Sequence, residues 1–148
     1  MATEPQPGKS PRSSARTKAR KQALDILFES DLRELGSAEI LAIHTEDSET
    51  PIRDFTIELV TGVTEHTAVI DEAIMAHLSD GWSLERMPRV DRNLARVAVY
   101  ELMYTTTATD VILAEAIGLC QELSTDESPA FLNGVLSAIA AAGTRPGQ

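Results

Sequence analysis

Cysteine is nearly absent from this chain of 148 residues, since Cys120 is the single one. A lone cysteine excludes an internal disulfide and is typical of a reducing compartment. Cys120 follows Leu119 in an amphipathic run, so we expect a buried structural thiol and not a reactive one. No apolar run reaches the roughly 18 residues of a membrane-spanning helix, and the basic N-terminus is not followed by the apolar segment of a secretory signal. We therefore expect a cytoplasmic protein.

The chain also has few residues for metal or catalytic chemistry. Its three histidines share no metal-ligand spacing with one another or with Cys120, so we predict no zinc site. The acid pairs at 71–72 and 126–127 are adjacent and point apart on a helix, and no serine lies in a Gly-x-Ser-x-Gly elbow. Gly-Lys-Ser at 8–10 lacks the earlier glycine of a phosphate-binding loop. We expect no cofactor and no catalysis, because an enzyme would need a site assembled from distant, unmarked residues.

Aromatic residues are scarce, with three Phe, two Tyr and one Trp. RNA-binding proteins built on sheets need aromatic platforms on which bases stack. The composition therefore excludes that class of RNA-binding protein.

Lysine is absent beyond residue 21, which makes the charge distribution uneven. Residues 1–21 hold six basic side chains and one acidic one, a net charge of +5. The remaining residues carry seven arginines against 22 acids, a net charge of −15. A basic segment on an acidic body indicates a local anion-binding site. Such segments also occur as solubilising disordered tails, and composition alone leaves both readings open.

The apolar spacing predicts an all-α fold, because no useful length of the chain alternates with period two. About seven helices are expected, over residues 14–35, 37–44, 51–65, 67–79, 88–104, 111–123 and 128–142. Ser13 or Ser14 is expected to cap the first helix, and Gly36 to stop it. Ser128-Pro129 is a cap followed by a first-turn proline, which is typical of the start of a helix.

The composition divides the chain into three parts. Prolines and a glycine interrupt residues 1–13, so we expect a disordered basic arm there. Residues 14–143 have the length of a single helical domain, and residues 144–148 are expected to form a flexible tail.

Within the segment 82–104, an apolar stripe and a basic stripe run side by side along one predicted helix. The apolar stripe is spaced as on one buried helix face and includes Val90, Leu94, Val97 and Ala98. The basic stripe consists of Arg89, Arg92 and Arg96. We expect this helix to hold a core with one face and to meet something anionic with the other. Trp82 and Leu84 are expected to plug the junction before it.

Three sequence blocks match a known family. Residues 82–104 read Trp-Ser-Leu-Glu-Arg-Met-Pro-Arg-Val-Asp-Arg-Asn-Leu-Ala-Arg-Val-Ala-Val-Tyr-Glu-Leu-Met-Tyr. A second block covers residues 115–136 and includes Phe-Leu-Asn-Gly-Val-Leu, and an opening block covers residues 19–28. Taken in this order over roughly residues 16–139, the blocks resemble the NusB family of bacterial transcription antitermination factors.

The resemblance implies a fold of two small helical bundles packed as one domain. It implies an RNA-binding regulator that pairs with NusE, a small-subunit ribosomal protein, on the single-stranded boxA element of nascent ribosomal RNA leaders. The complex would keep RNA polymerase elongating through terminators, so the polymerase is an indirect partner and the protein binds without catalysis. Ala95 and Ala114 stand where the family usually has Leu and Asn or Asp, and neither departure removes a basic residue.

The resemblance also implies the site residues. The RNA-contacting set is Arg12, Arg16, Lys18, Arg20, Lys21, Ser128 and Phe131. The partner-facing set is Phe28, Leu32 and Asp91. The residues alone also allow structural roles: Asp91 would then stabilise the positive end of its helix, and both phenylalanines would pack at the edge of the core.

Two other function classes stay open from the residues. One is a helical protein-interaction module without RNA specificity, whose basic arm only solubilises it. The other is a helix-turn-helix DNA-binding protein, which the break at Asp80-Gly81 allows. The helix after that break lacks the usual polar base readers at its start, which weighs against the second class.

Overall fold

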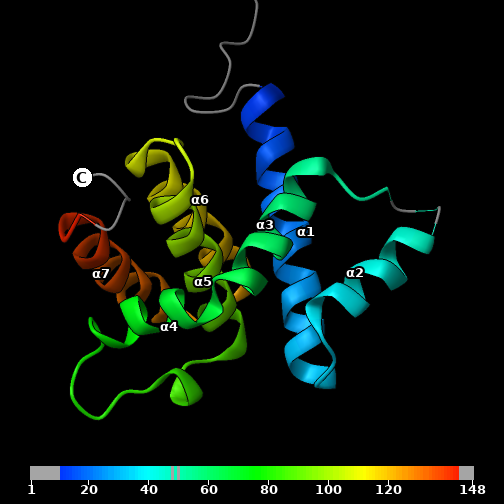
Figure 1. Cartoon of the computed structure of the whole chain (residues 1–148). Coiled ribbons are helices and arrows are strands. Elements are labelled where there is room, and N and C mark those ends of the chain that lie inside the picture. Colours follow the sequence, from blue (N-terminus) through cyan, green and yellow to red (C-terminus); the bar gives the residue numbers. More distant parts are fainter. Residues whose placement is uncertain (1–10, 48, 50, 144–148) are drawn as a thin grey trace, which may run out of the picture.

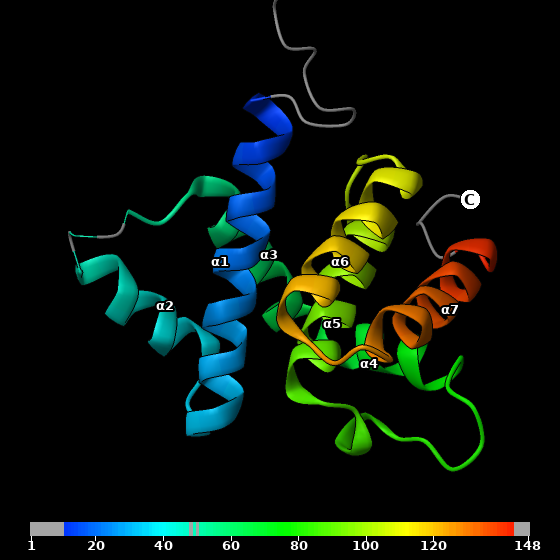
Figure 2. The ribbon, with the colours of Figure 1, turned by 180° about the vertical axis from the view of Figure 1, so that it is seen from behind.

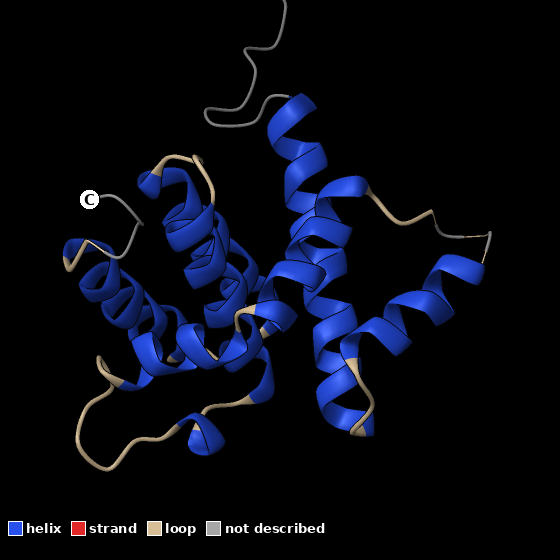
Figure 3. Ribbon diagram, viewed as in Figure 1, coloured by secondary structure: helices blue, strands red, loops and turns tan. Residues whose placement is uncertain are grey.

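The computed structural model describes residues 11–47, 49 and 51–143, and this part of the chain contains helices and no strand (Figure 3). The helices are α1 (Pro11–Arg33), α2 (Ser37–Glu46), α3 (Asp54–Glu65), α4 (Thr67–Met75), the short 3-10 helix η1 (Leu84–Arg86), α5 (Arg89–Tyr104), α6 (Thr109–Leu123) and α7 (Ser128–Ala141). The expected all-α fold is confirmed. None of the described helices is both long and apolar enough to cross a membrane.

The helices form two groups that share one core (Figure 1). Helices α1, α2 and α3 pack together, and α4, α5, α6 and α7 form the second group. Helix α5 also packs against α1 and α3, so it joins the two groups. Seen from behind, α1 lies between α2 and the α5–α6 pair (Figure 2). The expectation of two small packed helical bundles is confirmed.

Helix α5 is buried on most sides, because apolar residues continue beyond the expected stripe to neighbouring positions of the helix. Val97, Ala98 and Val99 are all buried, and Ala95 has no exposed surface. Gly62 of α3 meets this helix closely: a Cβ added at Gly62 would lie 2.1 Å from Cε1 of Tyr100. The missing side chain therefore lets α3 pack directly on the Tyr100 ring.

The ends of α1 differ from the sequence-based expectation. The helix begins at Pro11, before the serines expected to cap it, because the fixed φ of proline suits a first helical position. It ends at Arg33, where Glu34 takes a left-handed conformation with φ 56°. The Leu35 N–H donates to the Ser30 carbonyl at 3.1 Å, which closes the helix end as a Schellman motif. Gly36 instead precedes α2 as its cap.

Other boundaries shift by a few residues. Helix α3 begins at Asp54, so Pro51 lies in the loop before it. Helix α4 ends at Met75 and turns follow it, which shortens the expected helix. Glu127, rather than the expected Ser128, is the cap position of α7. The greater part of the expected arm, residues 1–10, and the expected tail, residues 144–148, lie outside the described residues.

Candidate RNA and partner interface

Two of the expected RNA-contacting cations are exposed on the first half of α1. Arg16 is exposed, and its guanidinium carbon lies 4.2 Å from the centre of the Phe55 ring. A cation above an aromatic face is attracted by the ring's electrons and is held there while its outer side meets solvent. Lys18 is exposed and forms no ion pair with any described residue. The backbone of Arg12 belongs to the first turn of α1, but its side chain is outside the described part of the structure.

Arg20 is buried, with 4% of its surface exposed, and is held by two carboxylates. Its Nε and Nη2 donate to the two carboxylate oxygens of Glu101, each at 2.8 Å, and Nη1 donates to Glu115 Oε1 at 2.8 Å. Burial alone lowers the pKa of Arg20, but the two carboxylates outweigh it and raise the pKa above its ordinary value. The prediction that Arg20 contacts RNA phosphate is therefore wrong for this structure. Arg20 instead joins α1 to α5 and α6.

Lys21 forms an exposed ion pair with Glu122, near the C-terminal end of α6. Its Nζ lies 2.7 Å from Glu122 Oε1, and both side chains are about half exposed. The hydrogen bond to Glu122 and then the charge of Glu122 raise the pKa of Lys21. An exposed pair of this kind contributes little to stability, so the lysine can exchange Glu122 for a phosphate at small cost.

The turn between α6 and α7 is tied to the start of α5 by hydroxyl groups. Ser124 Oγ donates to Asp91 Oδ1 and lies 3.0 Å from Ser128 Oγ, which in turn lies 2.7 Å from Thr125 Oγ1. Asp91 is 1% exposed and Ser128 is 4% exposed. The prediction that Asp91 faces a protein partner is wrong for this structure, because its carboxylate points inward to Ser124. The buried Ser128 side chain shapes the turn and leaves little surface for RNA.

Phe131 is partly buried near the surface in the first turn of α7. Its ring centre lies 5.3 Å from that of Trp82, and the two planes are tilted by 37°. Trp82 was expected to plug the junction before α5, and this expectation is wrong, because the indole is 48% exposed. Leu84 fills that place and is buried, as expected.

The expected partner-facing residues of α1 lie on its second half. Leu32 is 54% exposed, so its side chain is accessible to another molecule. Phe28 is half-buried and does not pack against the main core cluster of the described residues. Beside Leu32 lies a groove of about 590 Å³, bounded by the end of α1, by α3 and by the first half of α5.

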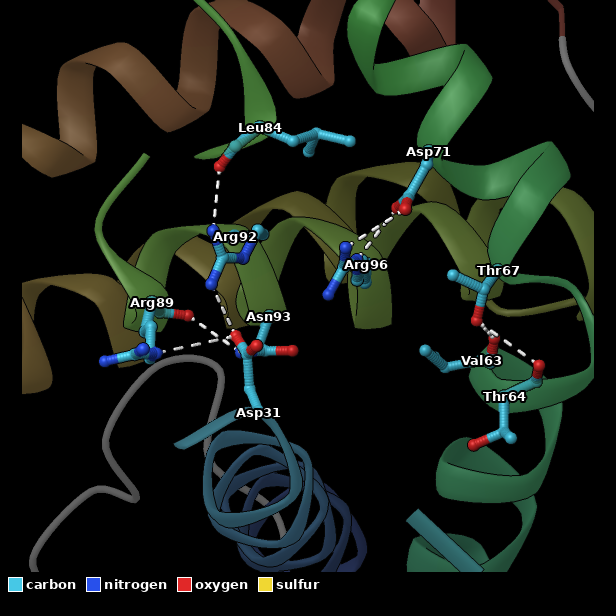
Figure 4. Close-up of polar contacts among 10 residues, drawn as sticks. All are labelled: Asp31, Val63, Thr64, Thr67, Asp71, Leu84, Arg89, Arg92, Asn93 and Arg96. Carbon is cyan, nitrogen blue, oxygen red and sulfur yellow. Dashed lines mark hydrogen bonds and ion pairs between the residues drawn. The ribbon is translucent and has the colours of Figure 1, made fainter. Parts of the chain in front are cut away.

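Two of the groove-lining side chains, Asp31 and Arg96, form ion pairs with neighbouring residues (Figure 4). Arg92 Nη2 lies 2.5 Å from Asp31 Oδ2, and Asn93 Nδ2 donates to the same oxygen at 3.3 Å. Burial raises the pKa of Asp31, but the hydrogen bond and charge of Arg92 outweigh it, and the net pKa is lowered. Arg96 Nε and Nη2 donate to the two carboxylate oxygens of Asp71 at 2.8 and 3.0 Å.

The basic stripe of α5 thus meets anions that belong to the chain itself. Arg92 and Arg96 are committed to carboxylates of α1 and α4. Arg89 lies at the groove's mouth with its Nε 3.9 Å from Asp31 Oδ2, and about half of its side chain is exposed. Of the three arginines, Arg89 is therefore the one best placed to meet another molecule.

Comparisons with known proteins agree with this arrangement. The model of the NusB family matches residues 17–141. The chain belongs to the NusB family. The transcription antitermination protein NusB of Acidothermus cellulolyticus is 54% identical over 86% of this chain and 88% of its own length. The NusB protein of Salinispora arenicola is 48% identical over 88% of this chain and 98% of its own length.

Solved structures of the family share the fold. One holds the antitermination factors NusB and NusE in complex with double-stranded RNA; it is 28% identical, covers 90% of this chain and 99% of its own, and has a TM-score of 0.77. The NusB structure from T. maritima is 30% identical, covers 92% of this chain and 94% of its own, and has the same TM-score. Family membership makes this chain a transcription antitermination factor, which acts by binding and is not an enzyme.

The two departures from the family pattern fall in different environments. Ala95 is fully buried in α5, where a larger side chain would need more space, whereas Ala114 is exposed on α6. Neither residue lies among the groove-lining side chains. Ala95 therefore affects core packing and Ala114 affects the surface of α6. Neither departure removes an exposed cation of this NusB-family protein.

Sequence reasoning missed the residues that hold the site in place. Glu101 follows Ala98 of the apolar stripe by three residues, and it was not identified from the sequence as the partner of Arg20. A glutamate inside an apolar stripe is a signal that a buried cation lies nearby, since a buried carboxylate needs a partner. Asp31 carried no such signal, because it lies among polar residues at the end of α1.

Proposed function

We propose that this NusB-family protein binds boxA-type single-stranded RNA of nascent ribosomal RNA leaders together with NusE, and so acts on the RNA polymerase elongation complex. We place it in the cytoplasm, where transcripts and ribosomal proteins meet in bacteria. The similarity to a solved complex of NusB and NusE with double-stranded RNA supports RNA and NusE as the two kinds of partner. The observation that carries the proposal is a group of solvent-accessible cations, Arg16, Lys18 and Lys21, on α1 of an otherwise acidic protein.

The cations lie on the first half of α1, and the aromatic ring of Phe131 lies at the start of α7. Arg16 and Lys18 are exposed, and Lys21 contacts Glu122 near the end of α6. The turn that follows α6 leads directly to Phe131. Cations neutralise phosphates, and an aromatic ring can stack on an unpaired base, so one RNA strand can engage both. Arg12 remains in the proposed set.

The partner surface lies on the second half of α1. Phe28 and Leu32 offer apolar contact area, and the groove beside them carries Asp31 and Glu34 together with Arg89. Mixed charge around an exposed leucine is typical of a protein–protein contact with an apolar centre and a polar rim. We assign this surface to NusE. It lies apart from the exposed cations along the same helix, so both partners can be bound at once.

Competition between single-stranded RNA and duplex DNA of equal length tests the proposal, with NusE absent and present. Single-stranded boxA RNA should displace the labelled RNA, and duplex DNA should not. Equal competition by duplex DNA would favour the helix-turn-helix class. Absence of RNA binding with and without NusE would leave only the protein-interaction module.

A matched pair of variants assigns the RNA surface. Lys18→Glu should weaken RNA binding, because it places a carboxylate beside the phosphates. Arg33→Glu makes the same change in net charge at the far end of α1, where Arg33 pairs with Glu29, and should leave binding of RNA alone nearly unchanged. Equal losses in both variants would show that net charge, and not this surface, governs binding.

A further inference from the structure

An aromatic pair joins the loop before η1 to the start of α7. The ring centres of Trp82 and Phe131 lie 5.3 Å apart with a tilt of 37° between their planes. The contact covers only part of the indole, since 48% of Trp82 is exposed. A tryptophan placed only to fill the core would bury most of its large apolar surface. The exposed part of the indole is therefore free to meet another flat ring.

A hollow of about 530 Å³ lies against this indole, lined by Asp80, Gly81, Trp82 and Arg86. Arg86 Nη1 donates to the Gly81 carbonyl at 3.1 Å, so the loop itself holds the guanidinium at the hollow. Gly81 has φ 87°, a conformation that side-chain-bearing residues rarely adopt, and it bends the loop around the hollow. The hollow is thus shaped by its own hydrogen bond and turn.

The charges of the hollow indicate what fits it. Asp80 and Arg86 contribute one carboxylate and one guanidinium, and their formal charges cancel. A phosphate or a cation would be repelled by one of the two. A neutral flat ring with donors and acceptors on its edge can stack on the indole and use both groups. A nucleobase has this chemistry.

We propose that Trp82, with Asp80 and Arg86, forms a stacking site for one unpaired base of single-stranded RNA. The inference rests on the proposed function, because the strand that passes Phe131 would carry its next base onto the neighbouring indole. Phe131 and Trp82 then act as a two-ring surface for adjacent bases. Arg86 donates to an acceptor on the base edge, and Asp80 accepts from an exocyclic amino group.

The experiment uses the full chain and a single-stranded boxA-type RNA of about 12 nucleotides, which is long enough for such a surface. Trp82 is the only tryptophan, so intrinsic tryptophan fluorescence reports on this site alone. Unlabelled RNA should quench that fluorescence along the same curve that anisotropy of an end-labelled RNA gives for binding. Each titration is run with RNA alone and with NusE already bound.

Three variants separate stacking from folding. Trp82→Leu should weaken RNA binding by about tenfold or more, the effect of losing one stacked base, and Trp82→Phe should keep most of the affinity. Ile43→Ala is the matched control, since Ile43 is 47% exposed on α2, which lies on the other side of α1 from α7 (Figure 1). It should bind RNA like the unmodified chain. Circular dichroism melting checks that each variant is folded.

Three outcomes would overturn the proposal in different ways. RNA binding that leaves Trp82 fluorescence and the affinity of Trp82→Leu unchanged removes the stacking site and leaves the proposed function standing. Quenching by NusE without RNA, with Trp82→Leu weakening only NusE binding, shows a protein contact instead. A chain that binds no RNA in the anisotropy assay, with or without NusE, refutes the proposed function and this site together. If Trp82→Leu does not fold, two results still test the stacking site. These are the quenching of Trp82 fluorescence by RNA and the RNA affinity of Trp82→Phe.

Discussion

Arg20 and Glu101 face each other across the junction of α1 and α5, with two parallel hydrogen bonds of 2.8 Å between guanidinium and carboxylate. Both side chains are almost fully buried. Paired, hydrogen-bonded charges of this kind are tolerated inside a protein because each satisfies the other. The pair fixes how the helix that carries the exposed cations sits on the second bundle.

Arg20→Ala should destabilise the fold strongly, because it leaves the Glu101 carboxylate buried and unpaired. The expected loss is about 3–5 kcal/mol in the free energy of unfolding, measured by urea denaturation. The double variant Arg20→Met with Glu101→Leu should recover much of it, since the buried Glu101 carboxylate is then gone and the remaining carboxylate, Glu115, is 23% exposed. A single variant as stable as the unmodified chain would show that the pair is not buried in solution.

The salt dependence of RNA binding should reflect the exposed cations only. Phosphate contacts from Arg16, Lys18 and Lys21 contribute about −2 to the log–log slope of affinity against salt for single-stranded RNA, and Arg12 adds about −0.7. Reversing the charge of Arg16 and Lys18 together should remove their two contacts and make the slope shallower by at least about 1.4. Filter binding over a range of salt measures it. A folded double variant with the original slope would place the phosphate contacts elsewhere.

Asp91→Asn should weaken the fold and spare the partner. The carboxylate accepts from Ser124 in a buried position, so replacing it is expected to cost about 1–3 kcal/mol in unfolding free energy. NusE affinity, measured by calorimetry, should be unchanged because Asp91 is covered. A large loss of NusE affinity at an unchanged melting temperature would restore the partner-facing role that the sequence suggested.

Cys120 should be inert in the folded protein. Burial, and then the charge of Asp91, raises the pKa of its thiol to about 11, so little thiolate exists near neutral pH. At pH 8 its reaction with a thiol-specific reagent should be about 100-fold slower in the folded protein than in urea. The raised pKa also means that stability present below pH 9 is lost as the pH rises towards 11, and Cys120→Ala should remove that part of the loss. Equal rates folded and unfolded would contradict the buried thiol.

Local patterns predicted the helices well, because apolar spacing and proline positions act within one helix. The buried faces of α5 and α7 follow directly from that spacing. Contacts between distant parts of the chain were not predictable in the same way. Arg20 was placed in the RNA-contacting set, yet the two carboxylates that hold it are 81 and 95 residues away in the sequence.

The same limit applied to the residues of the site. An acidic residue in a first helical turn suits either a helix end or a partner, and only the position of Ser124, 33 residues later, shows where Asp91 points. Leu32 was expected to face a partner, and its side chain is 54% exposed on the second half of α1. Its partner-facing role stays a prediction. Trp82 was expected to plug the junction before α5, but its indole is 48% exposed in the loop before η1.

Thermodynamic coupling between the two proposed partners tests the whole account most directly. RNA affinity is measured by filter binding with and without saturating NusE, for the unmodified chain and for Phe28→Ala. NusE should tighten RNA binding at least tenfold, about 1.4 kcal/mol of coupling, and RNA should tighten NusE binding equally. Phe28→Ala, once shown to be folded, should lose that enhancement and keep the weak, salt-sensitive binding of the isolated protein. Full RNA affinity without NusE, or an enhancement that survives in Phe28→Ala, would contradict the account.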